Sequence, residues 1–327
     1  MKNLIILLSC LLFAGSVYGW GQKGHDVTAY IAECHLTPEA AQKIDKVLNG
    51  HSPVYYCNWM DIASHTPEYN YTKTWHYLNI DEGQTLETMP RNPKGDVLTA
   101  VTTLVAELKA GGLAPEAETE KLKMLIHLVG DMHCPMHTGR LSDIGGNQRP
   151  VLMFGRRTNL HSAWDSAILE AGHKWSYTEW QEQIDRLTDD EAALVQAGEP
   201  QDWLKETHAI CVGIYEDSPE GTKISYDYVD KYTPVIEQQF VADAAVLDQV
   251  RVVDTHDLLV AFGQRMAGGE GELITDLQLD LFVGEFGDTD FRALQVAQNS
   301  NGFTQTGCQF TNMFRAGNMI FGCTVRK

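Results

Sequence analysis

The chain has 327 residues, of which 43% are hydrophobic, and its formal net charge is −19 at pH 7. This size allows one large domain, or one domain with a smaller appendage. The charge argues against a basic surface that binds a phosphate backbone by counterion release. Any phosphate substrate should therefore be held mainly by metal ions, which supply positive charge locally.

The first nineteen residues have the pattern of a secretory signal peptide. A short positive start at Met1–Asn3 precedes an apolar stretch from Leu4 to Ala14, and small residues follow near Gly19. Cleavage after Gly19 would make Trp20 the first residue, and a lipoprotein cut before Cys10 is the rival route. No later segment is apolar for long enough to span a bilayer. We expect an exported protein without membrane insertion, in a periplasm or outside the cell.

Cysteine usage suits an exported chain. Removal of the leader leaves an even number of cysteines, which permits three disulfides whose pairing the sequence does not give. No Cys-x-x-Cys occurs, so a cysteine-based zinc site is not expected. The cysteines are Cys34, Cys57, Cys134, Cys211, Cys308 and Cys323.

Helical signals dominate up to residue 240, and they predict an all-α body without strand–turn–strand repeats. A glycine-rich loop from Gly139 to Arg157 is long enough to shape a substrate cleft. The predicted helices cover 37–48, 96–109, 116–133, 159–169, 178–187, 189–197, 201–215 and 226–240.

The tail from Val241 differs in composition. Residues 275–282 alternate apolar and polar side chains, which favours a strand. The tail is predicted to be either a small accessory module, closed by Cys308 and Cys323, or poorly packed sequence.

Histidine and aspartate recur at metal-ligand spacing through the first half of the chain. His127 with Asp131, and His161 with Asp165, are four residues apart, so each pair leaves one helix face. Imidazole and carboxylate ligands suit zinc. A neutral amine at Trp20 would be a further ligand. The remaining candidates are His25, Asp61, His76 and His137.

Spacing leaves two assignments open, because Asp61 can pair with His65 or His76, and His133 is as well placed as His137. The alternative to a metal site is that these side chains form an ordinary polar helix face. A lone histidine on an apolar face is more often a core residue, as expected for His35, His51, His173, His208 and His256. The candidate ligands are nearly enough for three metal sites if some ligands are shared between sites. Clustered zinc ions activate water and neutralise a leaving oxygen, so the pattern indicates a zinc hydrolase acting on phosphate esters.

These motifs resemble the zinc-dependent, single-strand-specific nucleases of fungi, plants and bacteria, which also have 3′-nucleotidase activity and share a superfamily with zinc-dependent phospholipase C. The resemblance covers about residues 20–240 in the family's order. It rests on Trp20–His25, Asp61 with His76, His127-x-x-x-Asp131-x-x-x-x-x-His137, Gly145-Gly146-Asn147 and Asn159-Leu-His161-Ser-Ala-Trp-Asp165.

The resemblance implies a multi-helix fold with a trinuclear zinc cleft. One zinc ion is then bound by Asp61, His76, His127 and Asp131. A second is bound by His137, His161 and Asp165, and a third by the Trp20 amine and carbonyl, His25 and a shared Asp131 oxygen. His65 and His133 are not ligands in this assignment.

The implied reaction is attack of a metal-held hydroxide on phosphorus, in line with the 3′-oxygen, which gives 5′-phosphate products. Asp61 would orient the attacking water. Tyr77 would stack the nucleobase, and Asn79 stands where fungal members carry an acidic residue. Single-stranded DNA, RNA and 3′-nucleotides are the expected substrates, and no protein partner is predicted.

Two departures from the family pattern stand out. Ser64 occupies a position that is arginine in many members, which predicts slower turnover. After Phe240 the expected final helix is replaced, although Phe262–Ala267 faintly resembles it. We therefore expect a signal peptide at 1–19, a nuclease domain at 20–240 (to about 267 if that stretch belongs to it), and an atypical tail at 241–327, either an accessory module or a frame-altered segment.

Two other functions compete with this prediction. Zinc-dependent phospholipase C shares the fold, but it typically ends its ligand set with glutamate and has a shorter loop. A non-catalytic, zinc-binding secreted paralogue is supported only by Ser64 and the unusual tail.

Overall fold

The computed structural model describes residues 20–188, 191 and 198–243, together with the backbone of three strands in the tail. The signal-peptide prediction, most of the predicted 189–197 helix, Cys308 and His256 lie outside the described residues. Contact clustering divides the chain into residues 1–252 and 253–327.

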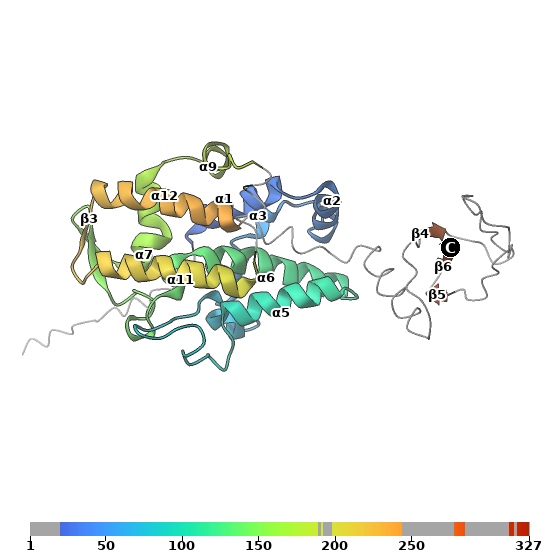
Figure 1. Cartoon of the computed structure of the whole chain (residues 1–327), viewed down its shortest axis with the longest axis horizontal. Coiled ribbons are helices and arrows are strands. Elements are labelled where there is room, and N and C mark those ends of the chain that lie inside the picture. Colours follow the sequence, from blue (N-terminus) through green and yellow to red (C-terminus); the bar gives the residue numbers. More distant parts are fainter. Residues whose placement is uncertain are drawn as a thin grey trace, which may run out of the picture. The chain divides into compact units, whose positions relative to one another are not determined.

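The first unit is helical, as predicted, and is organised around one central helix, α6 (Pro115–His133). Helices α1 (Gln22–Cys34), α5 (Val97–Ala110), α11 (Pro200–Asp217) and α12 (Tyr226–Asp243) all contact α6 (Figure 1). Every residue of α6 from Met124 to His133 is buried. A polar side chain on this stretch therefore faces the protein interior whichever way it points.

The shorter elements complete this unit, and several helices begin at side-chain caps. Thr37 caps α2 by accepting a hydrogen bond from the Ala40 amide, and Asp96 caps α5 through the Thr99 amide. The shorter elements are α2 (Pro38–Val47), α3 (Pro53–Tyr56), α4 (Trp59–Ala63), α7 (Leu160–Ser162), α8 (Ile168–Gly172) and α9 (Tyr177–Ile184), with the 3₁₀ helices η1 (Asn70–His76), η2 (Pro135–Thr138) and η3 (Leu141–Asp143) and the π-helical turn η4 (Ala163–Ala167).

A small sheet is the main difference from the predicted all-α body. Strands β1 (Pro150–Met153) and β2 (Arg156–Asn159) form an antiparallel hairpin, and β3 (Lys223–Ile224) pairs with β1 in parallel. The hairpin occupies the second half of the predicted 139–157 loop. Its strands are four residues long, too short for the alternating pattern that reveals a strand in sequence. An open depression of about 420 Å³ borders the hairpin and is lined in part by Asn147, Arg157 and Asn159.

The apolar interior of the first unit forms three clusters. The largest contains Trp20, Trp164, Trp180 and Phe240, and the Trp20 and Phe240 rings meet edge to face at 4.9 Å. This cluster fixes the start of the described chain against α12. No helix in the described part of the chain has the length and apolar character needed to cross a membrane.

The cysteines correct one prediction. Among the described residues, Cys34, Cys57, Cys134 and Cys211 are all free thiols, so the three disulfides that the cysteine count permits do not form. Cys134 and Cys211 are both almost completely buried, and Cys34 is exposed. These four cysteines lie on, or directly end, separate helices (α1, α3, α6 and α11), and none of them has a partner sulfur in the described part of the chain, which sequence cannot reveal.

The tail contains a three-stranded antiparallel sheet with strand order β4-β6-β5. Its strands are β4 (Gln278–Gly284), β5 (Phe314–Ala316) and β6 (Met319–Arg326). The strand predicted at 275–282 overlaps β4. The choice between an accessory module and a frame-altered segment stays a prediction, as does pairing of Cys308 with Cys323.

Candidate metal centre

The central helix α6 supplies the innermost pair of candidate ligands. His127 and Asp131 are both 0% exposed, and His127 Nε2 lies 3.2 Å from Asp131 Oδ2. Burial by itself would raise the pKa of Asp131, but His127 and His137 outweigh it and hold that pKa well below its usual value. Burial would likewise lower the pKa of His127, but Asp131 and Asp61 hold it well above. The pair is thus an interior charge cluster.

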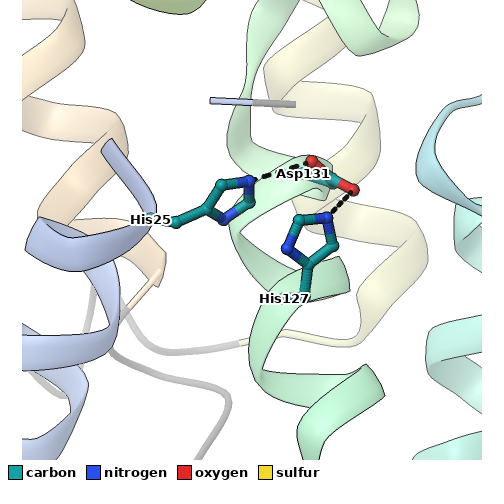
Figure 2. Close-up of side chains that lie close together, drawn as sticks. All are labelled: His25, His127 and Asp131. Atoms are coloured by element: carbon teal, nitrogen blue, oxygen red, sulfur yellow. Dashed lines mark ion pairs between the residues drawn. The ribbon is translucent and has the colours of Figure 1, made fainter. Parts of the chain in front are cut away.

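His25 on α1 completes a first group that can hold a metal ion, together with His127 and Asp131. Figure 2 shows the two imidazoles on separate oxygens of Asp131, with His25 Nε2 3.5 Å from Oδ1. The two rings stack with centroids 4.1 Å apart. Gly130 permits this approach, because a Cβ there would lie only 2.8 Å from His25 Nδ1.

Asp61 on α4 and His76 at the end of η1 form a second group with His127. His76 Nδ1 lies 2.9 Å from Asp131 Oδ2 and 3.8 Å from Asp61 Oδ1, and His127 Nε2 lies 3.5 Å from Asp61 Oδ1. His76 is 2% exposed, whereas His65 is exposed on the surface. Of the two partners that spacing allows for Asp61, the structure brings His76 to it.

A third group combines Cys134, His137 and Asp165. His161 borders it, since its Nε2 lies 3.3 Å from Asp165 Oδ2 and its ring stacks on His137 at 5.4 Å. Burial raises the pKa of Asp165 well above its usual value, and the charges of Asp131 and Asp61 add to the rise. A cation nearby would stabilise the ionised form of such a carboxylate.

Three of the histidines are oriented by backbone carbonyls. The Nδ1 atoms of His127, His137 and His161 lie 2.6, 2.5 and 2.7 Å from the carbonyl oxygens of Cys57, His76 and Gly145. A carbonyl oxygen only accepts, so each Nδ1 carries a proton and Nε2 is the ring atom left to bind a metal ion. This is the usual arrangement of an imidazole prepared for a metal ion.

The His161–Asp165 pair lies in unusual local structure. His161 is in the short α7, but Asp165 is in the π-helical turn η4, where the helix widens. The loop before them is held by Asp143, whose Oδ1 accepts the Gly146 amide at 2.7 Å. Gly145 and Gly146 have φ of +62° and +83°, a region where a Cβ is strained.

The buried polar atoms that lack a hydrogen-bond partner test whether this donor set fits a metal ion. They include both ring nitrogens of His25, Nε2 of His76 and Oδ1 of Asp131. Buried polar groups in proteins are normally satisfied, and unpaired ones are costly. These atoms point into the clusters of imidazole and carboxylate described above, so the residues present fit divalent metal ions.

The site is reached from the side of two carboxylates. Asp61 and Asp165 are 8% and 7% exposed, whereas the other members of the three groups are exposed by 2% or less. These two carboxylates are therefore the members of the groups most accessible to water or substrate. Burial would raise the pKa of Asp61, but the hydrogen bond and charge of His127 keep it below its usual value.

Tyr77 and Asn79 lie in an extended segment beside the third group. The Leu78 amide donates to the His137 carbonyl at 2.8 Å, and Ile80 and Gly139 are paired in the same way at 2.9 Å. Because side chains alternate along such a segment, Leu78 and Ile80 are buried while Tyr77 and Asn79 are half-buried on the opposite side. A Cβ on Gly145 would lie 3.2 Å from Asn79 Oδ1.

The remaining residues singled out in the sequence, Trp20, Ser64 and His133, are all buried. Trp20 is fully buried, and the neighbouring Gly21 amide donates to the Asp165 carbonyl at 2.7 Å. Ser64 is 4% exposed, and its hydroxyl donates to the Asp61 carbonyl. His133 is buried on α6 but belongs to none of the three groups among the described residues.

Sequence reasoning missed one member of these groups, Cys134. The absence of Cys-x-x-Cys argued against any cysteine in a metal site. A signal was nevertheless present, because Cys134 lies three residues after Asp131 and three before His137.

Among the described residues, the structure defines a class, namely helical proteins with a buried, multi-group metal centre of histidines and carboxylates. Comparison with known proteins makes this specific. Residues 20–247 match the S1/P1 Nuclease family, so the chain belongs to that family. It is a nuclease, a hydrolase acting on ester bonds of nucleic acids.

Individual relatives agree with the family match. The chain is 26% identical to Endonuclease 2 of Arabidopsis thaliana, over 72% of this chain and 90% of the relative. It is also 26% identical to Nuclease S1 of Aspergillus oryzae, over 72% and 92%. Nuclease P1 of Penicillium citrinum is 30% identical over 49% of this chain and 63% of its own length.

Proposed function

We propose that this chain is an exported, zinc-dependent endonuclease and 3′-nucleotidase that hydrolyses single-stranded DNA and RNA to 5′-phosphate products. The observation that carries the proposal is the sharing of ligands, since His127 belongs to two of the three groups and Asp131 contacts members of all three. Shared ligands bring several metal ions close together, an arrangement that stabilises both the attacking and the leaving oxygen in phosphodiester hydrolysis.

The proposal assigns each ligand to one of three zinc ions. Asp61, His76, His127 and Asp131 hold the first, and His137, His161 and Asp165 the second. His25, an oxygen of Asp131, and the amine and carbonyl of Trp20 hold the third. When bound, such ions lower the pKa of water and stabilise charge on the phosphoryl and leaving oxygens.

The protein's own residues orient the reactants. Asp61 is more exposed than the other members of its group, so its carboxylate is available to position an attacking water. The carbonyls behind His127, His137 and His161 fix the rings, which keeps the site preorganised.

Export is supported by the leader-like start and by the position of Trp20. Its ring packs in the core against Phe240, and its neighbour Gly21 is bonded to the Asp165 carbonyl. Signal-peptide cleavage after Gly19 would create an amine at this fixed point. The proposed location is a periplasm or the space outside the cell.

Single-stranded substrates are supported by the half-buried Tyr77, next to Leu78 whose amide donates to the His137 carbonyl; its ring would stack an unpaired base. Asn79, on the same side, would contact the base edge. With a net charge of −19, base stacking and metal–phosphate contacts would replace the usual basic groove.

Product analysis tests this proposal. The purified exported chain should release 5′-nucleotides from single-stranded DNA and RNA, and adenosine from 3′-AMP, while duplex DNA is cut more slowly. Amino-terminal sequencing should begin at Trp20. Products with 3′-phosphate ends, or equal rates on single and double strands, would contradict it.

A further inference from the structure

Cys134 lies within the third metal-binding group, a role that the spacing of residues in the sequence did not predict. Its side chain is completely buried, and its Sγ is 3.8 Å from Asp165 Oδ1. The donor atoms of Cys134, His137 and Asp165 all lie within 4.8 Å of one another. Cys211 is almost equally buried but belongs to no such group among the described residues.

The local backbone directs this thiol toward His137. Cys134 ends α6 in an extended conformation, with φ −78° and ψ 116°, as expected of a residue that precedes proline. A 3₁₀ turn follows, in which the His137 amide donates to the Cys134 carbonyl at 3.0 Å. The turn keeps His137 close to Cys134, and their donor atoms form one group with Asp165.

The separations lie close to those of donors that share one zinc ion, with a different oxygen of Asp165 facing each partner. With Zn–S of about 2.3 Å and Zn–O of about 2.0–2.2 Å, tetrahedral donors lie about 3.5 Å apart, and N and O donors about 3.3 Å. The structure has 3.8 Å between Cys134 Sγ and Asp165 Oδ1, and 3.3 Å between His161 Nε2 and Asp165 Oδ2.

An independent observation points to a cation here. Asp131 Oδ1 is completely buried, has no hydrogen-bond partner and lies 3.5 Å from His137 Nδ1. An unsatisfied anionic oxygen next to a cluster of imidazole, carboxylate and thiol is the environment in which a divalent ion is stabilised.

We propose that Cys134 is a thiolate ligand of the metal ion held by His137, His161 and Asp165. The inference rests on the proposed function only in requiring that a zinc ion bind there. The thiol proton is released to solvent as the Zn–S bond forms. Four protein donors are the full set for tetrahedral zinc, so this ion is held more tightly than three donors would hold it.

The competing explanation is that Cys134 merely donates a weak S–H hydrogen bond to Asp165. A hydrogen bond and a metal bond to sulfur differ in spectroscopic signature, so activity is not needed to decide. Zinc X-ray absorption of the wild-type chain reports a sulfur neighbour at about 2.3 Å if the thiolate binds. Cobalt substitution adds a sulfur-to-metal charge-transfer band.

The experiment compares wild type with Cys134→Ser, Cys134→Ala and a matched control, Cys211→Ser. Wild type and the control should show the zinc–sulfur distance and the cobalt band, and both Cys134 variants should lose them. Zinc affinity at one site should fall about tenfold or more in those variants, as for other weakened metal sites. The wild-type measurement keeps the test valid even if a variant folds poorly.

Three results would overturn the proposal. A metal-loaded, hydrolytically active wild type without a sulfur neighbour would remove Cys134 from the site and leave the proposed function intact. A cobalt band that persists in Cys134→Ser would assign the sulfur to another cysteine. A folded wild type that binds no metal would overturn both this inference and the proposed function.

Discussion

The two His–Asp pairs have the same spacing in sequence but lie in different surroundings. His127 and Asp131 are on the fully buried half of one regular helix and make contacts with four other candidate ligands. His161 and Asp165 span a short α-helix and a π turn, beside a glycine loop and a thiol. Regular structure thus supplies the shared centre of the site, and irregular structure supplies the third group.

Removing charge from the α6 pair should have the largest effect. Asp131→Asn keeps the shape of the side chain but removes an anion that contacts ligands from all three groups. We expect the rate of single-stranded DNA hydrolysis to fall at least about a thousandfold, since several kcal/mol of metal stabilisation would be lost. Bound metal, measured on the same sample, should fall by more than one ion.

Asp165→Asn is the matched change in the other pair and should remove a single ion. Asp45→Asn, an exposed change on α2, serves as the control and should leave both quantities unchanged. Greater metal loss from Asp165→Asn than from Asp131→Asn would reverse the comparison between the two pairs.

The base-stacking role of Tyr77 gives the next largest effect. Loss of the ring in Tyr77→Ala should raise KM for single-stranded DNA about 5- to 150-fold, because stacking of one base on an aromatic ring contributes about 1–3 kcal/mol. Tyr77→Phe keeps the ring and should behave as wild type. Steady-state kinetics on a short oligonucleotide decide this, and an unchanged KM in the alanine variant would remove Tyr77 from the substrate site.

Glycine substitutions probe the loop beside the second pair. Gly145 and Gly155 have similar positive φ values, +62° and +79°, so alanine at either should lower the free energy of unfolding by about 1–2 kcal/mol. A Cβ at Gly145 also meets Asn79 and Met136, whereas at Gly155 it meets nothing within 4 Å. Only Gly145→Ala should therefore raise KM, by a few-fold, as kinetics and chemical denaturation together would reveal. Equal KM changes in both variants would mean that backbone strain alone is responsible.

The smallest effect is expected at Ser64, near the first pair. Ser64→Arg should raise kcat a few-fold, short of the about tenfold that a charge-assisted hydrogen bond of about 1.5 kcal/mol would give. The gain in kcat is reduced because Ser64 is only 4% exposed, so the longer arginine side chain must extend out of this buried position. Ser64→Lys lacks the planar guanidinium that donates two parallel hydrogen bonds, so its kcat should rise less. An arginine variant no faster than wild type would contradict the idea that Ser64 slows turnover.

Features of the molecule that depend on local sequence signals could be predicted, whereas those that depend on packing between elements could not. Helices such as α2 and α5 follow from caps at Thr37 and Asp96, and the i,i+4 spacing was enough to bring His127 and Asp131 together. The choice between His65 and His76 depends on how η1 folds against α6, which no local pattern encodes. The hairpin at 150–159 was missed because four-residue strands have too little alternation.

Cys134 was missed for a different reason. Its position depends on the 3₁₀ turn that begins at Pro135 and on the approach of η4, which is distant in sequence. Long-range packing of this kind decides which donors meet, whereas spacing reports only those on one helix. The free thiols have the same origin, since pairing depends on distances between separate elements.

Metal content measured together with reversible loss of activity tests the central claim most directly. The purified chain should hold about three zinc ions and hydrolyse single-stranded DNA. Chelation should abolish hydrolysis and lower the melting temperature, since each ion at a hundred times its Kd contributes about 2.7 kcal/mol to stability. Added zinc should restore both. A folded chain that binds no zinc, or one whose hydrolysis survives complete metal removal, would contradict the account.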